Sequence, residues 1–192
     1  MSALPKHTPT PEQYLEQERS ADFKSEYIAG EIFAMSGAKL NHNRIQSNLI
    51  GEIRNLFKNR PCDVLGSDMK VWIDQAESFV YPDLSGLCGD FEFYDDREDT
   101  YSNPQFVVEI LSDSTESYDR GKKFLYYQTL ESLLEYVLVS QDETVVEIFR
   151  KNGTDWIYHS YRKPDEMLRL DSVGCEIPLS EIYRNVTFSD NE

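Results

Sequence analysis

A carboxylate in the middle of an apolar run is the feature of this sequence that most directly indicates chemistry. Glu109 lies inside Phe106–Leu111, and a run of β-branched and aromatic residues this continuous is typical of a strand buried on both faces. A buried carboxylate without a partner is costly, so Glu109 needs a strong one, and a metal ion is the usual choice. A second acid, Asp83, lies in another short apolar run at residues 80–84. Two acids in buried strands predict a metal site.

A lysine further along the chain extends this prediction. Asp119, Lys123 and Tyr127 recur at every fourth position, which places them on one face of a helix. Lysine supplies fixed positive charge where a reacting phosphate gains negative charge, so a phosphodiester-cleaving metal site is the leading hypothesis. The alternative for Lys123 is an exposed salt bridge with Asp119, which would contribute little to stability.

Other polar residues are candidates for supporting roles. His42 lies on the apolar side of a predicted helix, where a core or capping histidine is an equally good interpretation. Glu26 and Glu31 flank a predicted hairpin turn and are candidates for a further metal-shell oxygen, although charges on strand surfaces are commonplace. Tyr127 is expected to pack in the core, and Asp119 to orient Lys123 rather than to bind metal.

These residues must be positioned by helices and strands whose signals follow one another along the chain. Thr10 and Pro11 form a typical helix start, and this helix is predicted to end near residue 18. Residues 25–35 alternate around Ala29–Gly30, which predicts a hairpin, and residues 40–57 carry a helical apolar stripe. The other predicted elements are strands at residues 64–73, 80–87, 105–111, 135–139, 144–149 and 156–161, a helix from Ser114 or Thr115 to about residue 130, and a short helix at 178–183.

Composition places the chain among folded globular proteins. Its 192 residues fit one domain, residues 1–192, and 40% of them are hydrophobic. No apolar stretch approaches the length of a membrane span, and the first residues lack the features of a signal peptide. Cys62, Cys88 and Cys175 are few and widely spaced, so neither a disulfide framework nor a zinc site is expected, and a reducing cytoplasm is favoured.

The charge distribution bears on the partner. The formal net charge of −16 should repel nucleic acid at long range. The charge is uneven, however, because residues 39–60 are basic and residues 90–99 are strongly acidic. Arg44, Arg54 and Lys58 in the first segment are candidates for contacts with nucleic-acid phosphates. The alternative is that both segments are simply solvated surface.

The order of elements predicts an α/β or α+β domain with a mixed sheet. No glycine-rich phosphate loop follows a predicted strand, which disfavours a doubly wound nucleotide-binding fold. The sequence also contains neither a Walker-type lysine motif nor a GxSxG elbow.

Several short motifs occur in a characteristic order and spacing from about residue 10 to residue 188. They are Glu26-Tyr27-Ile28-Ala29-Gly30-Glu31, Met35-Ser36, His42, Pro82-Asp83, Val108-Glu109-Ile110-Leu111-Ser112, Asp119 with Lys123 and Tyr127, and Glu135-Tyr136-Val137-Leu138-Val139. In this order the sequence resembles the Uma-type restriction endonucleases, a branch of the PD-(D/E)XK nuclease superfamily. The resemblance implies a restriction-endonuclease-like fold over residues 10–188, with a central mixed β-sheet flanked by helices and short flexible termini.

The resemblance also implies a site and a cofactor. Asp83 and Glu109 would bind Mg²⁺, with Mn²⁺ as a possible substitute, where their strands diverge. The superfamily places a lysine two residues after the acid, but Leu111 occupies that position in this chain. The Uma-type branch takes its lysine from the next helix, which implies that Lys123 is the catalytic lysine.

The function expected from these observations is that of a metal-dependent endonuclease acting on nucleic acid, with DNA as the expected substrate. A homodimer is expected, since two symmetric sites cut both strands of a duplex most easily. Two other classes stay open. One is a catalytically silent acidic scaffold for a basic partner, and the other is a metal-dependent hydrolase of a different substrate. Absence of metal binding would favour the first, and Mg²⁺ binding without nucleic-acid cleavage would favour the second.

Overall fold

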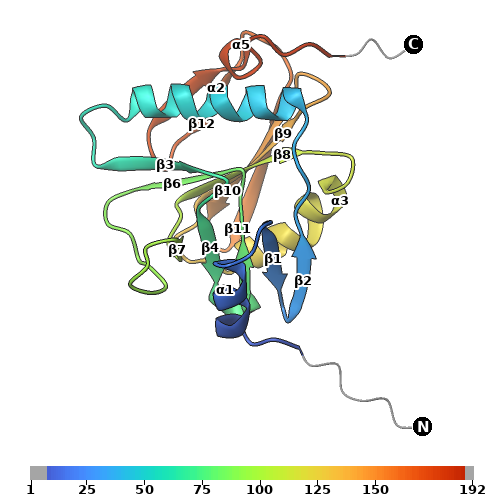
Figure 1. The fold of residues 1–192 in the computed structure, drawn as a ribbon. Coiled ribbons are helices and arrows are strands. Elements are labelled where there is room, and N and C mark those ends of the chain that lie inside the picture. Colours follow the sequence, from blue (N-terminus) through green and yellow to red (C-terminus); the bar gives the residue numbers. More distant parts are fainter. Residues whose placement is uncertain (1–7, 189–192) are drawn as a thin grey trace.

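A six-stranded mixed sheet organises the fold of residues 8–188, the part of the chain that the computed structural model describes (Figure 1). The strand order is β11-β10-β9-β8-β6-β3, and every pair is antiparallel except β8 with β9. The bounds are β3 Cys62–Gly66, β6 Leu84–Cys88, β8 Phe106–Leu111, β9 Glu135–Ser140, β10 Val146–Asn152 and β11 Asp155–Tyr161. Parallel neighbours such as β8 and β9 need a crossover connection, and the segment that carries Lys123 provides it.

Strand β8 lies in the interior of this sheet, between β9 and β6. All six of its residues are buried, as the apolar run predicts. Successive side chains point to opposite faces. Val108 and Ile110 therefore belong to the core cluster on one side of the sheet, and Val107 and Leu111 to the cluster on the other. Glu109 alternates with Val108 and Ile110, so its carboxylate points to the same side as Leu111.

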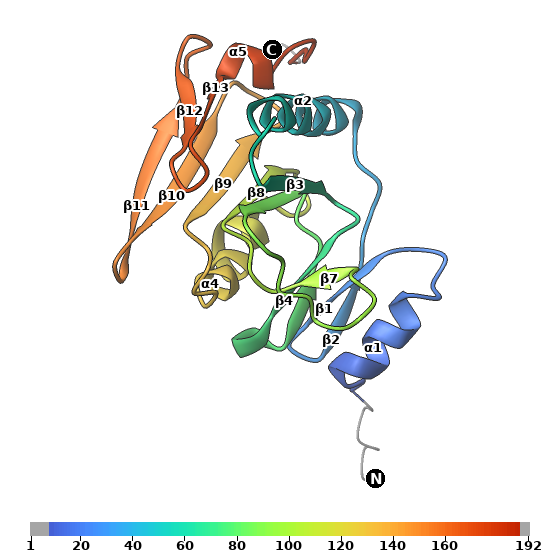
Figure 2. The ribbon, with the colours of Figure 1, turned by 90° about the vertical axis from the view of Figure 1, so that its left-hand side faces the viewer.

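Helix α2, Leu40–Leu56, covers the first side of the sheet (Figure 2). Its apolar stripe is fully buried at Ile45, Leu49 and Ile53, which confirms the predicted helix. A hairpin of β12, Met167–Leu170, and β13, Cys175–Pro178, completes this side together with α5, Leu179–Ile182. The hairpin was not predicted from the sequence.

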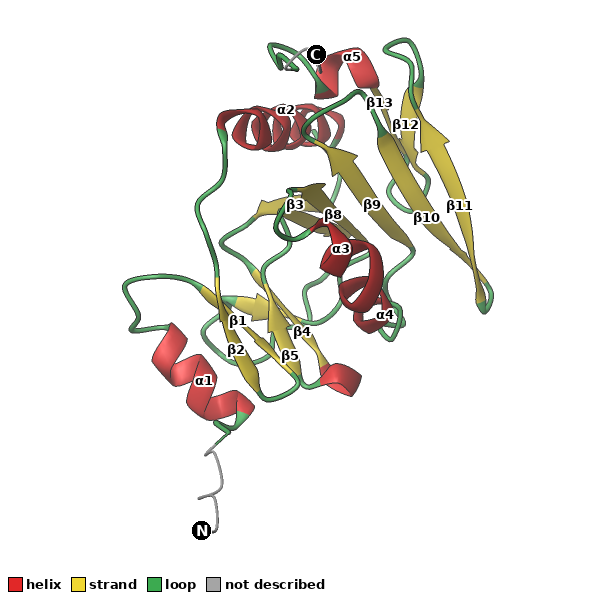
Figure 3. Ribbon diagram, turned by 90° about the vertical axis from the view of Figure 1, so that its right-hand side faces the viewer, coloured by secondary structure: helices red, strands yellow, loops and turns green. Residues whose placement is uncertain are grey.

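A helical segment of three parts covers the other side, so that α2 and α3 lie on opposite sides of β8 and β9 (Figure 3). It consists of α3, Glu116–Tyr118, a π-helical turn, Asp119–Lys123, and α4, Phe124–Tyr127. The sequence predicted one continuous α-helix here. The π-turn widens the helix in the stretch that carries the predicted site residues, a placement typical of functional sites.

A second, five-stranded sheet lies beside the first, with the order β2-β1-β5-β4-β7. Its strands are β1 Ser25–Ile28, β2 Glu31–Ala34, β4 Lys70–Ile73, β5 Ser78–Val80 and β7 Thr100–Tyr101, with a 3-10 turn at Asp74–Ala76. Helix α1, Pro11–Glu18, packs Tyr14 and Leu15 against Phe79 of this sheet. The predicted helix start is confirmed, because Thr10 caps α1 and Pro11 is its first residue.

Two predicted strands are wrong as single elements, because each is divided between the two sheets. The run at residues 64–73 is broken by a turn in which the Met69 N–H donates to the Gly66 carbonyl (3.1 Å), so it forms β3 and β4. The run at residues 80–87 is broken at Pro82 and forms β5 and β6. Proline lacks the N–H that a central ladder needs, and the chain therefore leaves one sheet and enters the other at this point.

The cysteine expectation is also corrected. Cys62 and Cys88 lie directly opposite each other in the β3–β6 register and are joined by a disulfide, while Cys175 is a free, buried thiol. Register between distant segments, which residue spacing does not reveal, brings this pair together. The termini that were predicted to be flexible lie outside the described residues, apart from residues 8 and 9. Within residues 8–188, no helix is long and apolar enough to cross a membrane.

The acidic segment at residues 90–99 is tied to the fold by an ion-pair network rather than simply solvated. Arg19 follows the last residue of α1. Its Nε and Nη2 donate to the Asp99 carboxylate (2.8 and 2.6 Å), and its Nη1 lies 2.8 Å from the Asp95 carboxylate. The ammonium of Lys70 lies 3.2 Å from Asp99. Hydrogen bonding from Arg19, aided by Lys70, holds the pKa of Asp99 well below its usual range.

Asp99→Asn is therefore expected to lower the free energy of unfolding at neutral pH by about 1–2 kcal/mol. A carboxyl whose pKa is depressed by folding stabilises the folded state above its unfolded pKa, and this contribution is lost as pH falls through the folded pKa. The difference from wild type should thus shrink below about pH 4. Thermal or urea unfolding across pH measures it, with Asp96→Asn in the same segment as the control. An equal loss at every pH would contradict this role.

Candidate active site

Asp83 is held rigidly at the point where the chain passes between the sheets. Its Oδ2 accepts a hydrogen bond from the Ile110 N–H (2.7 Å), and its Oδ1 lies 3.2 Å from Nε2 of His42. The side-chain amide of Gln46 donates to its backbone carbonyl (2.9 Å). Because Leu84 pairs with Val108 in the β6–β8 register, Asp83 lies beside Glu109.

Glu109 is only 4% exposed, so its carboxylate depends on internal partners. Its Oε1 accepts a hydrogen bond from the Tyr127 hydroxyl (3.2 Å) and lies 2.9 Å from the ammonium of Lys123. The expectation that this acid needs a strong partner is met by a lysine and a tyrosine. Both belong to the helical segment, as the four-residue spacing predicted.

Lys123 is the centre of the charged cluster. Its ammonium is buried and lies 2.9 Å from Glu109, 3.3 Å from Glu26 and 3.7 Å from Asp119. It is therefore not the exposed salt bridge of the alternative interpretation. Glu26 comes from β1 of the second sheet, and its Oε1 also accepts the Tyr81 N–H (2.9 Å). The cluster consequently joins both sheets and the π-turn at one point.

The electrostatics of the cluster follow from burial and from an excess of carboxylates. Burial raises the pKa of Glu109 well above its usual value, Lys123 opposes this rise, and the nearby Asp119, Asp83 and Glu26 add to it. Burial by itself would lower the pKa of Lys123, but Glu109, Glu26 and Asp119 outweigh it and hold that pKa well above its usual value. The surrounding carboxylates thus favour the protonated form of Lys123, and a single lysine cannot neutralise all of them.

The π-turn fixes the position of this lysine. Its first residue, Asp119, and its last, Lys123, are both buried, although charged residues in helices usually face solvent. The Tyr136 hydroxyl of β9 donates to the Asp119 backbone carbonyl (2.9 Å) and so attaches the turn to the sheet. Burial raises the pKa of Asp119 while Lys123 opposes it.

The sequence profile of the family Uma2, described as "Putative restriction endonuclease", matches residues 11–180. The chain belongs to the Uma2 family. This confirms the resemblance found in the sequence, and the match extends over both sheets and every residue of the cluster.

Two relatives and one solved structure are also similar to this chain. The uncharacterized proteins slr1290 and sll1609 of Synechocystis sp. are 36% and 37% identical, covering 93% and 75% of this chain and 93% and 81% of their own lengths. A crystal structure described as "a putative nuclease belonging to DUF820 from Anabaena variabilis" superimposes with a TM-score of 0.74 at 18% identity, covering 91% of this chain and 97% of the other. The expected restriction-endonuclease-like α/β fold is thereby confirmed.

The supporting residues of this Uma2 chain divide into two groups. His42 contacts Asp83 and Tyr127 contacts Glu109, so both lie within the cluster. Glu31 lies at the exposed start of β2 and is not among the ion-pair partners of Lys123. Glu26 lies in the cluster as a partner of Lys123, and its role as a further metal-shell oxygen stays a prediction. Glu26 belongs to the buried strand β1, whereas Glu31 follows the turn.

The three predicted nucleic-acid contacts do not form one cluster. Arg44 lies in the first turns of α2, close in sequence to His42. Arg54 is exposed in the last turn of α2, and Lys58 is exposed beyond its end. Twelve residues of helix separate His42 from Arg54, which corresponds to about 18 Å.

The donor set suits a hard divalent cation. Among residues 8–188, no three His, Cys, Asp or Glu side chains converge as a ready-made metal group. Mg²⁺ is commonly held by one or two carboxylates and keeps several waters, so a pair of acids is sufficient. Burial raises the pKa of Glu109, and the nearby carboxylates add to this rise, so a bound cation would favour its ionised form. The sharing of one cation by Asp83 and Glu109 stays a prediction.

Proposed function

We propose that this Uma2 protein is a Mg²⁺-dependent endonuclease that hydrolyses phosphodiester bonds in nucleic acid, with DNA as the expected substrate and Mn²⁺ as an alternative ion. The observation that supports this most strongly is the buried Lys123–Glu109 pair beside Asp83. Burying three carboxylates around one lysine is expensive for a purely structural ion pair, because hydrophobic residues of similar volume would stabilise the fold at least as well.

In the proposed reaction, Asp83 and Glu109 would hold the ion, which would supply charge to neutralise the phosphate and lower the pKa of a water molecule. The ammonium of Lys123 contributes a second, fixed positive charge where the phosphate becomes more negative. Because its pKa is raised, it keeps this charge and donates hydrogen bonds rather than acting as a base.

The remaining residues orient these groups. Tyr127 donates to Oε1 of Glu109 and so fixes the orientation of the carboxylate that would hold the ion. Asp119 and Glu26 hold the ammonium from two further directions. His42 lies against one oxygen of Asp83 and fixes the orientation of its carboxylate. Such preorganisation lets the charges act without rearranging during the reaction.

We further propose that the enzyme acts as a homodimer in the cytoplasm. Two sites related by a twofold axis would address both strands of a duplex. The Cys62–Cys88 disulfide would then lie in a reducing compartment, where such bonds are uncommon.

Nicking of supercoiled DNA by the wild-type protein tests the proposal. Relaxed and linear products are expected with Mg²⁺ or Mn²⁺, and none after chelation by EDTA. Isothermal titration calorimetry with Mg²⁺ measures whether the protein binds the ion, and this result distinguishes the two alternative functions. Mg²⁺ binding without cleavage of DNA or RNA would indicate a hydrolase of another substrate. Absence of both would indicate a catalytically silent scaffold.

A further inference from the structure

A polar depression on the outer side of α2 is distinct from the acidic cluster. Its volume is about 560 Å³. It lies between α2 and the segment that follows α5, and its lining residues are Asn43, Arg44, Ser47, Asn48, Arg184, Asn185 and Thr187. Two of these are arginines, the others are neutral hydrogen-bonding residues, and the lining contains no acid. In a chain with a formal net charge of −16, a concave surface of this composition favours an anionic ligand.

The depression is built by specific hydrogen bonds rather than by chance proximity. The side-chain amide of Asn48 donates to the backbone carbonyls of Ile182 (3.0 Å) and Arg184 (2.9 Å). The amide of Asn41 donates to the Thr187 carbonyl (2.9 Å). Two asparagines of α2 therefore fix the segment after α5, and so bring Arg184 beside Arg44 although the two are far apart in sequence.

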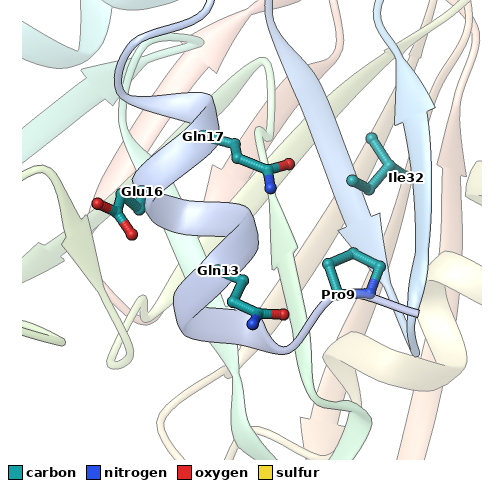
Figure 4. Close-up of a pocket in the computed structure, with 5 residues that line it drawn as sticks. All are labelled: Pro9, Gln13, Glu16, Gln17 and Ile32. Carbon is teal, nitrogen blue, oxygen red and sulfur yellow. The ribbon is translucent and has the colours of Figure 1, made fainter. Parts of the chain in front are cut away.

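A second depression on the molecule provides a comparison. It lies between α1 and β2, measures about 390 Å³, and is lined by Pro9, Gln13, Glu16, Gln17 and Ile32 (Figure 4). This lining has one acid and no cation, so it offers no preference for an anion. The depression on α2 is lined by two arginines and no acid, so of the two depressions only this one favours an anionic ligand.

The position of the α2 depression relates it to the acidic cluster. His42 and Gln46 point inward from the first turns of α2 and contact Asp83. Asn43, Arg44 and Ser47 lie on the same turns and line the depression on the outer side. The depression therefore lies across α2 from Asp83.

We infer that this depression binds the phosphate backbone of the nucleic-acid strand next to the cleavage site, an assignment that rests on the proposed nuclease function. Arginine presents a planar set of donors that matches phosphate oxygens, and asparagine and serine add neutral donors. Arg184 pairs with Glu181 through one nitrogen (2.9 Å) and has four further N–H donors. This surface supplies the attraction that the acidic remainder of the chain lacks.

The test is equilibrium binding of a fluorescently labelled DNA duplex in EDTA, measured from low to physiological salt for wild type and for the double variant Arg44→Gln/Arg184→Gln. Loss of two phosphate contacts should weaken binding at low salt and reduce the slope of log affinity against log salt by about 1.8, which is about 0.9 for each contact. The control is Arg162→Gln/Arg169→Gln, which changes net charge equally on the β11–β12 side and should leave the slope unchanged.

Asn48→Ala tests the construction of the depression. It retains both arginines but releases the carbonyls of Ile182 and Arg184, so only the Arg184 contact should be lost. The slope should then fall by about 0.9. Thermal unfolding of each variant shows that the change is not due to a general loss of folding.

The outcomes separate this inference from the proposed activity. Cleavage by wild type with an unchanged salt slope in the double variant would overturn the depression as a phosphate site and leave the nuclease intact. A reduced slope in a protein that cleaves nothing would support the depression and overturn the nuclease. Thermal stabilisation by millimolar inorganic phosphate in wild type, without a change in duplex binding in the double variant, would identify a free-phosphate site and overturn the strand assignment.

Discussion

Replacing Lys123 with methionine is expected to reduce cleavage by about a hundred- to a thousandfold while Mg²⁺ binding persists. Methionine fills most of the volume of the lysine but removes the charge that lies 2.9 Å from Glu109. Glu26, Glu109 and Asp119 would then lack their common cation, so their attraction for Mg²⁺ should not decrease. Single-turnover cleavage and calorimetric Mg²⁺ titration measure the two effects separately. Lys122→Met, an exposed neighbour, is the control.

Stability must be measured in the same variant. Removing one partner of a buried ion pair usually costs about 3–5 kcal/mol, because the other charge is left without compensation. Mg²⁺ should recover part of this loss, since an ion that binds only the folded state stabilises it. Full activity of folded Lys123→Met would refute the role of this lysine.

A second-site change tests whether the lysine has moved from strand to helix. Leu111 is buried and points to the same side of β8 as Glu109, which is where the superfamily carries its lysine. In the Lys123→Met background, Leu111→Lys should restore part of the activity. Recovery will be incomplete because a new ammonium must be buried among apolar neighbours. A folded, Mg²⁺-binding double variant without any recovery would contradict the equivalence of the two positions.

Asp83→Asn is expected to abolish cleavage and to weaken Mg²⁺ binding severely. Asparagine keeps an oxygen that can accept the Ile110 N–H, so the local fold should persist while the negative charge is lost. In wild type, Mg²⁺ at a hundred times its Kd should stabilise the fold by about 2.7 kcal/mol, and this increase should disappear in the variant. Thermal unfolding with and without Mg²⁺ measures it.

Asp155→Asn, at the exposed start of β11, is the matched control for Asp83→Asn and should retain both cleavage and Mg²⁺ stabilisation. If Mg²⁺ stabilised the Asp83→Asn variant as much as it stabilises the wild type, Asp83 would not be a metal ligand. The proposal would then have to rely on Glu109 with Glu26 as the second ligand.

Local signals predicted the elements that carry the site. The stripe of Ile45, Leu49 and Ile53 located α2, and the continuous run around Glu109 located the central strand. The four-residue spacing placed Asp119, Lys123 and Tyr127 on one face of a helix, but it did not show that this face reaches Glu109. Each of these predictions depends on residues that are close in sequence, where periodicity reports directly on burial.

Contacts between residues that are far apart in the sequence could not be predicted from such local patterns. Glu26 reaches Lys123 only because β1 belongs to a second sheet that lies against the first, and no local pattern encodes that meeting. The division of residues 80–87 was signalled by Pro82, but the apolar residues on both sides dominated the pattern. The Cys62–Cys88 disulfide depends on strand register in the same way.

The π-turn at Asp119–Lys123 also determines how the segment responds to changes in length. A π-turn holds one residue more than an α-helical turn, so the helix before it and the helix after it are out of phase by about 100°. Deleting Gly121 would restore an ordinary α-helix, yet it would rotate Asp119 away from Lys123 or carry Lys123 away from Glu109. The helix would survive such a deletion while the cluster would not. Loops elsewhere can lengthen and shorten as homologues diverge, but this segment must keep its residue count.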